Sequence, residues 1–412
     1  MIRHFFNNNR QTIFHTATAL LLLISTTLVG FSATKTKKKD HLQSEYIFPL
    51  QEKHVHSSCV TELPNGDLLA CWFEGSGERH ANDVMIRGAR LKKGDKEWSS
   101  PFLMADTPGN PDCNPIIFID QKERLHLVWI VVVANKWETS ILKTRISTNY
   151  QNEGAPKWDW QDIILLKPGK EFAQTLETKF TELNTPEQAW AEYAPLYERM
   201  IVEAAHDPAK RELGWMGRIK PLLFPGNKIL MPLYSDGFNV SLVAISDDSG
   251  DTWKPSLPIV GRGNIQPTIL QKKEGDLVAY MRDNGDSPGR IFESSSSDGG
   301  YSWTPAKKTS IPNPGSSVDA VTLSDGTWLM VCNDLENGRN KLSIYVSIQE
   351  GEDWQWIYSL EDVPLNEGSF AYPSIIQSKD KLIHISYTYN VNNLKTIKHV
   401  SFSISWLNSQ VK

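Results

Sequence analysis

The sequence predicts an all-β protein, a six-bladed β-propeller with one helical insert, and three observations support this prediction. The 412 residues include 26 glycines, 23 prolines and 14 tryptophans, a composition that favours many short strands joined by turns. A hairpin pattern recurs six times along the chain. A helical pattern is confined to one stretch, residues 170–212.

The recurring hairpin is a short polar turn followed by an apolar strand. The turn glycines at positions 226, 275 and 326 lie about 50 residues apart, which leaves room for two hairpins, or four strands, in each unit. Repeated four-stranded antiparallel units of this length are typical of propeller blades. The six copies begin at Pro64, Asp120, Pro225, Lys273, Ser324 and Ser378.

One interval, between the turns near Lys122 and Gly226, is about twice as long as the others. The helical stretch 170–212 lies inside it, and removing that stretch leaves roughly one blade length. The alternative is a seventh blade whose sequence has diverged. The helical pattern rests on four apolar residues that share one face: Phe172, Leu176, Phe180 and Leu183.

A second repeat is a polar turn that ends in tryptophan. It reads "SDDSGDTW" at residues 246–253, "SSDGGYSW" at 296–303 and, in a degenerate form, "SIQEGEDW" at 347–354. Ser246 and Asp248 have short polar side chains suited to bonding a turn, and Gly250 permits positive φ. We expect this turn to fasten its hairpin. A calcium loop is disfavoured because each copy has too few carboxylates at the required spacing.

The charge and the cysteine spacing disfavour several classes of function. The net charge of -5 and the lack of a long basic block beyond the N-terminus disfavour nucleic-acid binding. Cys59, Cys71, Cys113 and Cys332 have no metal-like spacing, and we expect neither a metal nor a cofactor. Cys59 and Cys71 fall in neighbouring predicted strands, so they are buried free thiols or, in an oxidising compartment, disulfide partners.

The N-terminus differs from the rest of the chain. Arg3 and Arg10 precede an apolar run that ends in small residues near Ala33. Residues 1–33 therefore predict a signal peptide, and a secreted or periplasmic protein. The alternative is an uncleaved membrane anchor with the protein facing outside. Residues 34–45 are then a linker, and residues 46–412 form the propeller.

The tryptophan turn has the form S-x-D-x-G-x-[ST]-W, which is the Asp-box. With the six-blade count, the chain from about Tyr46 to the C-terminus, apart from the helical insert, resembles the sialidase (neuraminidase) superfamily. In that family the boxes are structural. The resemblance implies a site in which three arginines clamp the substrate carboxylate. It also implies a tyrosine nucleophile activated by a glutamate, and a carboxylic acid that serves as acid and base.

Three positions match this set, one by one. Arg282 in "NIQPTILQKKEGDLVAYMR" stands where the second arginine is expected, and Arg339 in "NDLENGRNKLSIYVS" resembles the third. Tyr372 in "GSFAYPSII" resembles the nucleophile. The order of the three along the chain agrees with the family's order.

Two positions depart from the family's set. His56 stands where the first arginine is expected, and Gln266 stands where the glutamate belongs. A glutamine cannot take a proton, so the standard sialidase mechanism and sialic acid as the substrate are open questions. For the acid, the loop after the first strand pair offers Glu78, with Asp83 nearby. A half-buried carboxylate in such a loop can have its pKa raised enough to protonate a leaving oxygen.

Further polar residues stand at predicted strand starts or loops near the mouth of the propeller, where ligands bind in this architecture. We expect an anionic ligand there, because guanidinium groups hold carboxylates in bidentate fashion. The predicted substrate-binding residues that complete the set are Arg79, Arg218, Asp283 and Asp319, with His54, His80, Asn114, Lys220, Asp236, Asn333 and Asp334 also near the mouth.

These residues lead to three functional hypotheses. The first is an exported sialidase-like glycoside hydrolase that removes an acidic terminal sugar from a glycan. The second is a polysaccharide lyase acting on uronates, in which His56 or Tyr372 takes the C5 proton while arginines neutralise the carboxylate. The third is a glycan-binding propeller without catalysis. The expected partner is an acidic oligosaccharide in each case, and a membrane is contacted only through a possible N-terminal anchor.

Overall fold

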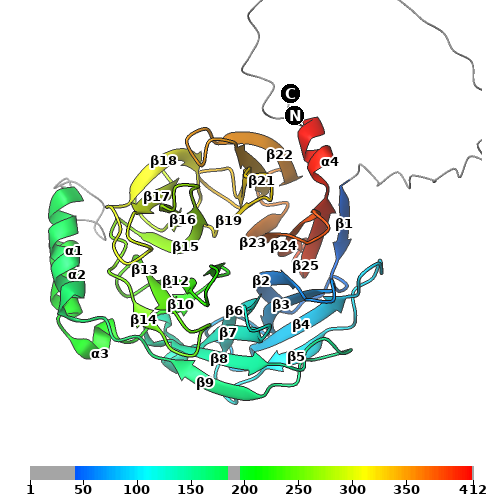
Figure 1. The fold of residues 1–412 in the computed structure, drawn as a ribbon, viewed down its shortest axis with the longest axis horizontal. Coiled ribbons are helices and arrows are strands. Elements are labelled where there is room, and N and C mark those ends of the chain that lie inside the picture. Colours follow the sequence, from blue (N-terminus) through cyan, green and yellow to red (C-terminus); the bar gives the residue numbers. More distant parts are fainter. Residues whose placement is uncertain (1–41, 184–194, 411–412) are drawn as a thin grey trace, which may run out of the picture.

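Six antiparallel sheets stand around a common axis, like the blades of a propeller (Figure 1). The structure is a computed structural model that describes residues 42–183 and 195–410. Within these residues there is no seventh sheet, so the predicted six-bladed fold is confirmed. The predicted signal peptide or anchor, residues 1–33, and most of the predicted linker lie outside the described residues.

The first three blades follow one another in chain order. Blade 1 contains β2 (His54–Glu62), β3 (Leu68–Gly75), β4 (Met85–Leu91) and β5 (Phe102–Ala105). Blade 2 contains β6 (Asp112–Ile119), β7 (Leu125–Val131), β8 (Ile141–Ser147) and β9 (Trp160–Ile164). Blade 3 contains β10 (Met216–Gly217), β11 (Leu222–Leu223), β12 (Ile229–Ser235), β13 (Val240–Ser246) and β14 (Lys254–Pro255).

The last three blades complete the ring. Blade 4 contains β15 (Asn264–Gln271), β16 (Leu277–Asp283), β17 (Arg290–Ser296) and β18 (Lys307–Pro312). Blade 5 contains β19 (Asp319–Thr322), β20 (Trp328–Cys332), β21 (Lys341–Ser347) and β22 (Gln355–Asp362). Blade 6 contains β23 (Ser369–Gln377), β24 (Ile383–Val391), β25 (Leu394–Phe402) and the N-terminal strand β1 (Gln43–Tyr46).

Blade 6 closes the ring with strands from both ends of the chain. β1 pairs with β25 in antiparallel register, with Gln43 opposite Ser401 and Tyr46 opposite Lys398. The pairing supplies hydrogen-bond partners to one edge of β25 and ties the two ends of the domain together.

Burial differs between the inner and outer strands of a blade. β7 is buried at every position, whereas β9 is exposed at every position except Ile164. The inner strands are covered on both faces by neighbouring blades, so their sequences are almost continuously apolar. This is why the repeated apolar strand after each turn is visible in the sequence.

The tryptophan turns have the structural role that the sequence predicts. Ser246 Oγ donates a hydrogen bond to Asp248 Oδ1 at 2.7 Å and accepts one from Gly250 N at 2.7 Å. Thr252 N also donates to Asp248 Oδ1, at 2.9 Å. Gly250 has a φ of 90°, which glycine adopts without strain. The second copy repeats this pattern around Asp298.

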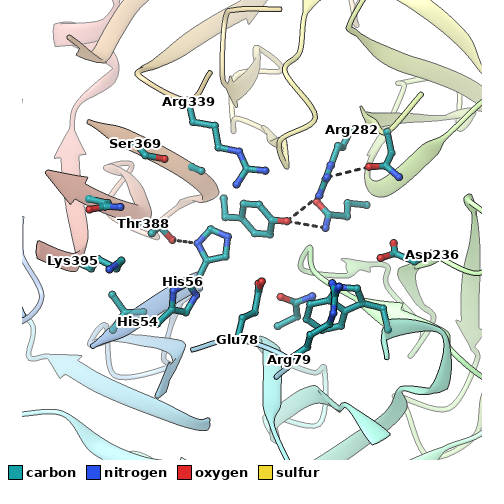
Figure 2. A pocket seen from close by; sticks show the side chains of 18 of the residues that line it. His54, His56, Glu78, Arg79, Asp236, Arg282, Arg339, Ser369, Thr388 and Lys395 are labelled. Atoms are coloured by element: carbon teal, nitrogen blue, oxygen red, sulfur yellow. Dashed lines mark hydrogen bonds between the residues drawn. The ribbon is translucent and has the colours of Figure 1, made fainter. Parts of the chain in front are cut away.

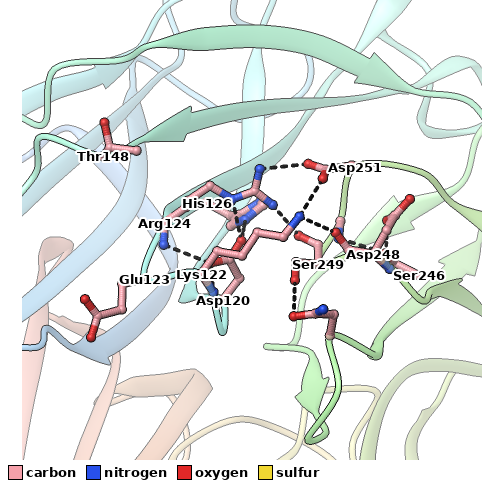
Figure 3. A network of polar contacts seen from close by, with 12 residues as sticks. Asp120, Lys122, Glu123, Arg124, His126, Thr148, Ser246, Asp248, Ser249 and Asp251 are labelled. Atoms are coloured by element: carbon pink, nitrogen blue, oxygen red, sulfur yellow. Dashed lines mark hydrogen bonds and ion pairs between the residues drawn. The ribbon is translucent and has the colours of Figure 1, made fainter.

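The first tryptophan turn also joins two blades (Figure 3). Lys122 Nζ and Arg124 Nη1, from the β6–β7 turn of blade 2, lie 2.8 Å and 2.7 Å from the carboxylate of Asp251 in blade 3. Arg124 also pairs with Asp120, a buried carboxylate that His126 contacts at 2.8 Å. The turn therefore fastens its own hairpin and the neighbouring blade.

Helices occupy the predicted insert at the outside of blade 3 (Figure 1). They are α1 (Lys170–Leu183), α2 (Pro195–Ala205) and α3 (Pro208–Arg211). Phe172 is buried, and its ring centroid lies 5.8 Å from that of Trp215 and 5.2 Å from that of Phe238. The apolar face of α1 therefore packs on blade 3.

The remaining helices are short: η2 (Val133–Asn135) and η3 (Trp137–Thr139) between β7 and β8, and α4 (Ile404–Gln410) after β25. Across the described residues, every helix is too short or too polar to cross a membrane. The four cysteines are buried and free, although Cys59 and Cys71 face each other in the β2–β3 ladder.

Candidate active site

A cavity of about 430 Å³ opens at one end of the propeller axis, and residues from all six blades line it. Figure 2 shows Arg282 and Arg339 reaching into this cavity from neighbouring blades, with Glu78 pointing in from another side. The size is within the range of small-ligand sites, about 300–1,000 Å³. The lining residues that carry polar or aromatic side chains are His54, His56, Glu78, Arg79, Asn114, Trp137, Tyr234, Asp236, Gln266, Arg282, Asn284, Arg339, Ser369, Tyr372, Thr388, Asn390 and Lys395.

A repeated β-bulge positions several of these side chains. The innermost strands β2, β6, β15 and β23 each lose register near their N-terminal ends. A residue with left-handed φ marks each bulge: Ser57 at 59°, Asn114 at 49°, Gln266 at 57° and Tyr372 at 57°. Left-handed backbone is uncommon for residues other than glycine and is often retained at functional sites. Here the bulges present Asn114, Gln266 and Tyr372 to the cavity.

Tyr372 lies at the centre of the polar contacts. Its hydroxyl oxygen accepts a hydrogen bond from Arg282 Nη1 at 3.0 Å and another from Gln266 Nε2 at 3.3 Å. Arg282 is held by a second hydrogen bond, from Nη2 to Asn284 Oδ1 at 3.2 Å. Both donors are directed at the oxygen, so they offset negative charge on it.

Two more arginines lie against the ring of Tyr372. The guanidinium carbon of Arg339 is 5.5 Å from the ring centroid, and Arg339 Nη2 donates to the carbonyl of Gly315 at 2.9 Å. The guanidinium carbon of Arg218 is 5.0 Å from the same centroid. Such distances allow cation–π attraction to hold the ring in place.

Arg218 differs from Arg282 and Arg339 because it does not line the cavity. It is only 1% exposed, and its Nη2 donates to the carbonyl of Pro373 at 2.9 Å. The prediction that Arg218 binds substrate is therefore corrected: this guanidinium supports Tyr372 from within the protein.

His56 packs against the other side of Tyr372. The two ring centroids are 4.0 Å apart, and His56 Nδ1 lies 2.9 Å from Thr388 Oγ1. Burial, reinforced by the nearby guanidinium of Arg339, holds the pKa of His56 well below its usual value of 6.5. The imidazole is therefore neutral near pH 7 and does not replace the positive charge that the family's first arginine supplies.

Two carboxyl groups face the cavity from other blades. Burial raises the pKa of Glu78 above its usual value of 4.5, although Arg79 and Arg339 oppose the shift. Burial likewise raises the pKa of Asp236, against the opposing charge of Arg282. A raised pKa keeps a carboxyl group protonated at higher pH, which is the property of a general acid.

Three predicted acidic residues lie outside the cavity, which corrects their expected roles. Asp83 is exposed and accepts hydrogen bonds from Ser76 N and Oγ, so it shapes the loop that carries Glu78. Asp283 is buried and pairs with Lys308 at 2.9 Å. Asp319 is buried and pairs with Lys220 at 2.6 Å. These carboxylates are already occupied by partners in the protein.

Sequence reasoning did not single out seven of the polar or aromatic lining residues: Trp137, Tyr234, Asn284, Ser369, Thr388, Asn390 and Lys395. Tyr234 accepts hydrogen bonds from Asn114 Nδ2 at 3.1 Å and from Gln266 Nε2 at 3.3 Å. Arg79, which was predicted, lies with its guanidinium carbon 5.5 Å from the Trp137 ring centroid. The one available signal was the position of Tyr234 just before Asp236, at the end of an apolar strand.

In the described part of the chain, the candidate metal ligands are the His, Cys, Asp and Glu side chains. No group of three or more His, Cys, Asp or Glu side chains lies close enough together to hold a metal ion there.

The six-bladed ring, with arginines and a tyrosine converging at its axis, defines a propeller of the sialidase superfamily. Within it, the chain belongs to the family described as the BNR repeat-like domain, whose pattern matches residues 66–183 and 206–385.

Known relatives agree with this assignment at the level of the fold. The anhydrosialidase of Macrobdella decora is 24% identical over 210 residues, which are 44% of this chain and 27% of that protein. The solved leech intramolecular trans-sialidase, in complex with 2,7-anhydro-Neu5Ac, has a TM-score of 0.62 at 16% identity and covers 87% of this chain and 69% of that one. The intramolecular trans-sialidase from Ruminococcus gnavus has a TM-score of 0.62 at 14% identity, and the match covers 87% of this chain and 96% of that one.

Proposed function

We propose that this protein is a glycoside hydrolase that removes a terminal acidic sugar from glycans. The observation that carries the proposal is the convergence of Arg282 and Arg339 on Tyr372 in one cavity, which Glu78 also enters. Guanidinium groups remain charged at any relevant pH and bind carboxylates in bidentate fashion. The acidic group of the sugar therefore lies between Arg282 and Arg339.

The chemistry divides between Glu78 and Tyr372. Glu78, whose pKa is raised by burial, donates a proton to the leaving oxygen as the glycosidic bond breaks. Water then adds to the anomeric carbon and returns a proton to Glu78. Tyr372 lies beneath the anomeric carbon, where its oxygen stabilises the positive charge of an oxocarbenium-like transition state. Gln266 donates a hydrogen bond to that oxygen but cannot take its proton, so the tyrosine lacks the carboxylate partner expected of a standard sialidase.

A screen of aryl glycosides and oligosaccharides that end in sialic, ulosonic or uronic acids tests the proposal. The expected result is release of one acidic monosaccharide, with turnover at least about a hundredfold lower in Tyr372→Phe, because a preorganised polar group at the reacting centre is lost. Turnover unaffected by Tyr372→Phe would contradict the mechanism. A complete lack of turnover with retained glycan binding would favour a non-catalytic propeller.

A second function, a uronate lyase, is favoured by one observation. His56 is a neutral imidazole in ring contact with Tyr372, and a neutral imidazole can accept a proton. In a lyase, His56 or Tyr372 would take the C5 proton of a uronate while Arg282 and Arg339 neutralise the carboxylate. The C4–O bond would then break, and the departing oxygen would take a proton from Glu78. The lyase product contains a new carbon–carbon double bond, so an increase in ultraviolet absorbance during turnover would identify it.

We also propose that the protein is exported, with residues 1–33 acting as a signal peptide. The support is the pattern of Arg3 and Arg10 followed by an apolar run and small residues. Mass spectrometry of the protein from separated cell fractions tests this. A chain that begins near residue 34 outside the inner membrane supports cleavage, a full-length chain in the membrane supports an anchor, and a full-length chain in the cytoplasm contradicts export.

A further inference from the structure

One wall of the active-site cavity is a row of polar side chains on blade 6. Ser369 of β23 lies directly opposite Asn390 of β24, and Asn390 lies directly opposite Lys395 of β25. Residues that are directly opposite in antiparallel strands share one face of the sheet, with their Cβ atoms about 4.5–5.5 Å apart. All three line the active-site cavity. We call Ser369, Asn390 and Lys395 the blade 6 row.

His54 of blade 1 belongs to the same wall. It lines the cavity, and Figure 2 shows it on the same side as Lys395 and Ser369. Burial, together with the positive charge of Lys395, lowers the pKa of His54 below its usual value of 6.5, so the imidazole is neutral near pH 7. A neutral imidazole has one N–H group to donate. The wall therefore combines one cation with uncharged hydrogen-bond donors.

The ammonium group of Lys395 has no carboxylate partner within the described residues. Its hydrogen bond goes to the carbonyl of Asn393 at 3.4 Å, which is long for such a bond. Two carboxyl groups line the cavity. Asp236 lies on the side opposite Lys395 in Figure 2, and Glu78 is influenced most strongly, among the cations, by Arg79. A cation in a ligand cavity that has no carboxylate partner favours an anionic group of the ligand.

Lys395 is distinct from the arginines that hold the carboxylate of the sugar. Arg282 donates to the hydroxyl oxygen of Tyr372, and the ring of Tyr372 lies 4.0 Å from that of His56. The ring of His56 lies a further 5.9 Å from that of His54, which the charge of Lys395 influences. An anion at the oxygen of Tyr372 therefore leaves Lys395 available for a second one.

We propose that the blade 6 row and His54 bind a second anionic group of the substrate, so that the preferred substrate carries two negative charges. The proposal rests on the proposed function of the active-site cavity and adds the charge class of the substrate. Two sources share the required chemistry: a sulfate ester on the acidic sugar, and the carboxylate of a second acidic sugar. Lysine binds either one as a point charge, because its ammonium group has three donors and no fixed plane.

The variant Lys395→Gln tests this proposal, because it removes the charge and keeps a long polar side chain. The hydrogen bonds between Gln51 and Lys395 use main-chain groups, so they are retained. Lys381→Gln is the matched control. It removes the same charge from blade 6, but Lys381 lies in the exposed β23–β24 turn and does not line the cavity. Melting curves of both variants check that they fold.

The assay compares probes that carry one negative charge with probes that carry two. For the sulfate ester, the probes are aryl glycosides of glucuronic acid and of sialic acid, each with and without one sulfate. For the second carboxylate, the probes are digalacturonate and its monomethyl ester. Calorimetric titration gives Kd for every probe, and kcat/KM is measured wherever turnover occurs.

We expect the wild-type protein to bind the doubly charged member of a pair at least about tenfold more tightly, since a hydrogen bond to a charged group is worth roughly ten- to a hundredfold. Lys395→Gln should abolish this preference. It should weaken binding of the singly charged member by no more than about threefold, because a single charge farther away is screened by salt. Lys381→Gln should change either Kd by less than about twofold.

A preference for the sulfated probes alone would identify a sulfate ester, and a preference for digalacturonate alone would identify a neighbouring carboxylate. The proposal is overturned by no preference for any doubly charged probe, by equal weakening of both members of a pair in Lys395→Gln, by a comparable loss in Lys381→Gln, or by a lack of binding. Turnover tests the hydrolase separately. Release of sugar from singly charged probes without the preference would support the hydrolase and overturn the second anion site, and a preference in Kd without turnover would do the reverse.

Discussion

The two ends of the propeller use carboxyl groups in opposite ways. The strand directions put the tryptophan turns at one end and the active-site cavity at the other. At the turn end, burial alone would raise the pKa of Asp248, but hydrogen bonds from Thr252 and Ser246 outweigh it and lower the pKa to about 2. That carboxylate is charged, fully partnered and structural.

At the cavity end, burial outweighs the interactions that lower the pKa of a carboxyl group. Burial raises the pKa of Glu78 and of Asp236, and neighbouring arginines offset only part of the shift. Gln266 Oε1 and Arg282 Nε are buried and have no hydrogen-bond partner within the described residues. The comparison teaches that a carboxylate partnered by turn hydrogen bonds stays charged, whereas a carboxyl group that faces the cavity has its pKa raised by burial.

The largest effect is expected from Glu78→Gln, which removes the proposed acid. Turnover should fall about 10²- to 10⁴-fold. In the wild-type protein, turnover should decline as the pH rises through the raised pKa of Glu78, because the acid must be protonated to act; the variant should lack this decline. A pH–rate profile measures both.

Glu97→Gln is the matched control, since Glu97 is an exposed carboxylate of blade 1 that lies outside the cavity. Its turnover and pH profile should match the wild type. If Glu97→Gln lost as much activity as Glu78→Gln, the assignment of the acid to Glu78 would be wrong.

The next effect is expected from Arg282→Lys. Lysine keeps the charge but cannot hold Tyr372 Oη and Asn284 Oδ1 together as the guanidinium does, so kcat/KM should fall about 10²- to 10³-fold. Arg145→Lys on the outer part of blade 2 is the control and should change kcat/KM less than about twofold. Comparable losses of kcat/KM in the two variants would show that the effect of Arg282→Lys does not depend on the location of Arg282 in the active-site cavity.

A smaller effect is expected from Gln266→Met, which removes the donors to Tyr372 and Tyr234 at similar side-chain volume. Arg282 still donates to Tyr372 Oη, so kcat should fall only about two- to tenfold. Steady-state kinetics with circular dichroism as a folding check measures this. A loss as large as that of Arg282→Lys would mean that Gln266 has a chemical role that its hydrogen bonds do not explain.

The smallest effect on activity is expected at the turn end, from Asp248→Asn. The variant should lose roughly 1–3 kcal/mol of unfolding free energy and melt a few degrees lower, with unchanged turnover per folded molecule. Because the folded pKa of Asp248 is depressed, its contribution is present above pH 3.8 and is lost as the pH falls toward about 2. Melting curves over that interval should show this loss in the wild type and not in the variant.

Asp247→Asn provides the control, because Asp247 is an exposed neighbour that pairs with Lys254 on the surface. Exposed pairs contribute about 0–1 kcal/mol, so its melting temperature should hardly change. A drop equal to that of Asp248→Asn would show that general surface charge, and not the turn, stabilises this end.

Local and periodic features of the chain were sufficient to predict the fold. The blade count follows from a turn repeated at a fixed interval, and the role of Asp248 follows from a pattern within eight residues. Arg282, Arg339 and Tyr372 were identified through the resemblance to the sialidase superfamily, and the structure brings the three together.

The sequence by itself determined the repeat, and the repeat determined the ring of blades. It also determined at which end of each strand the polar residues gather. Only the tertiary structure decided which of those polar residues face the cavity. Arg218 lies under Tyr372 because a residue 155 positions away, Pro373, accepts its hydrogen bond, and Asp319 is occupied by Lys220, 99 positions away. Such partners belong to different blades, and their meeting depends on ring closure and on bulges that no local pattern encodes.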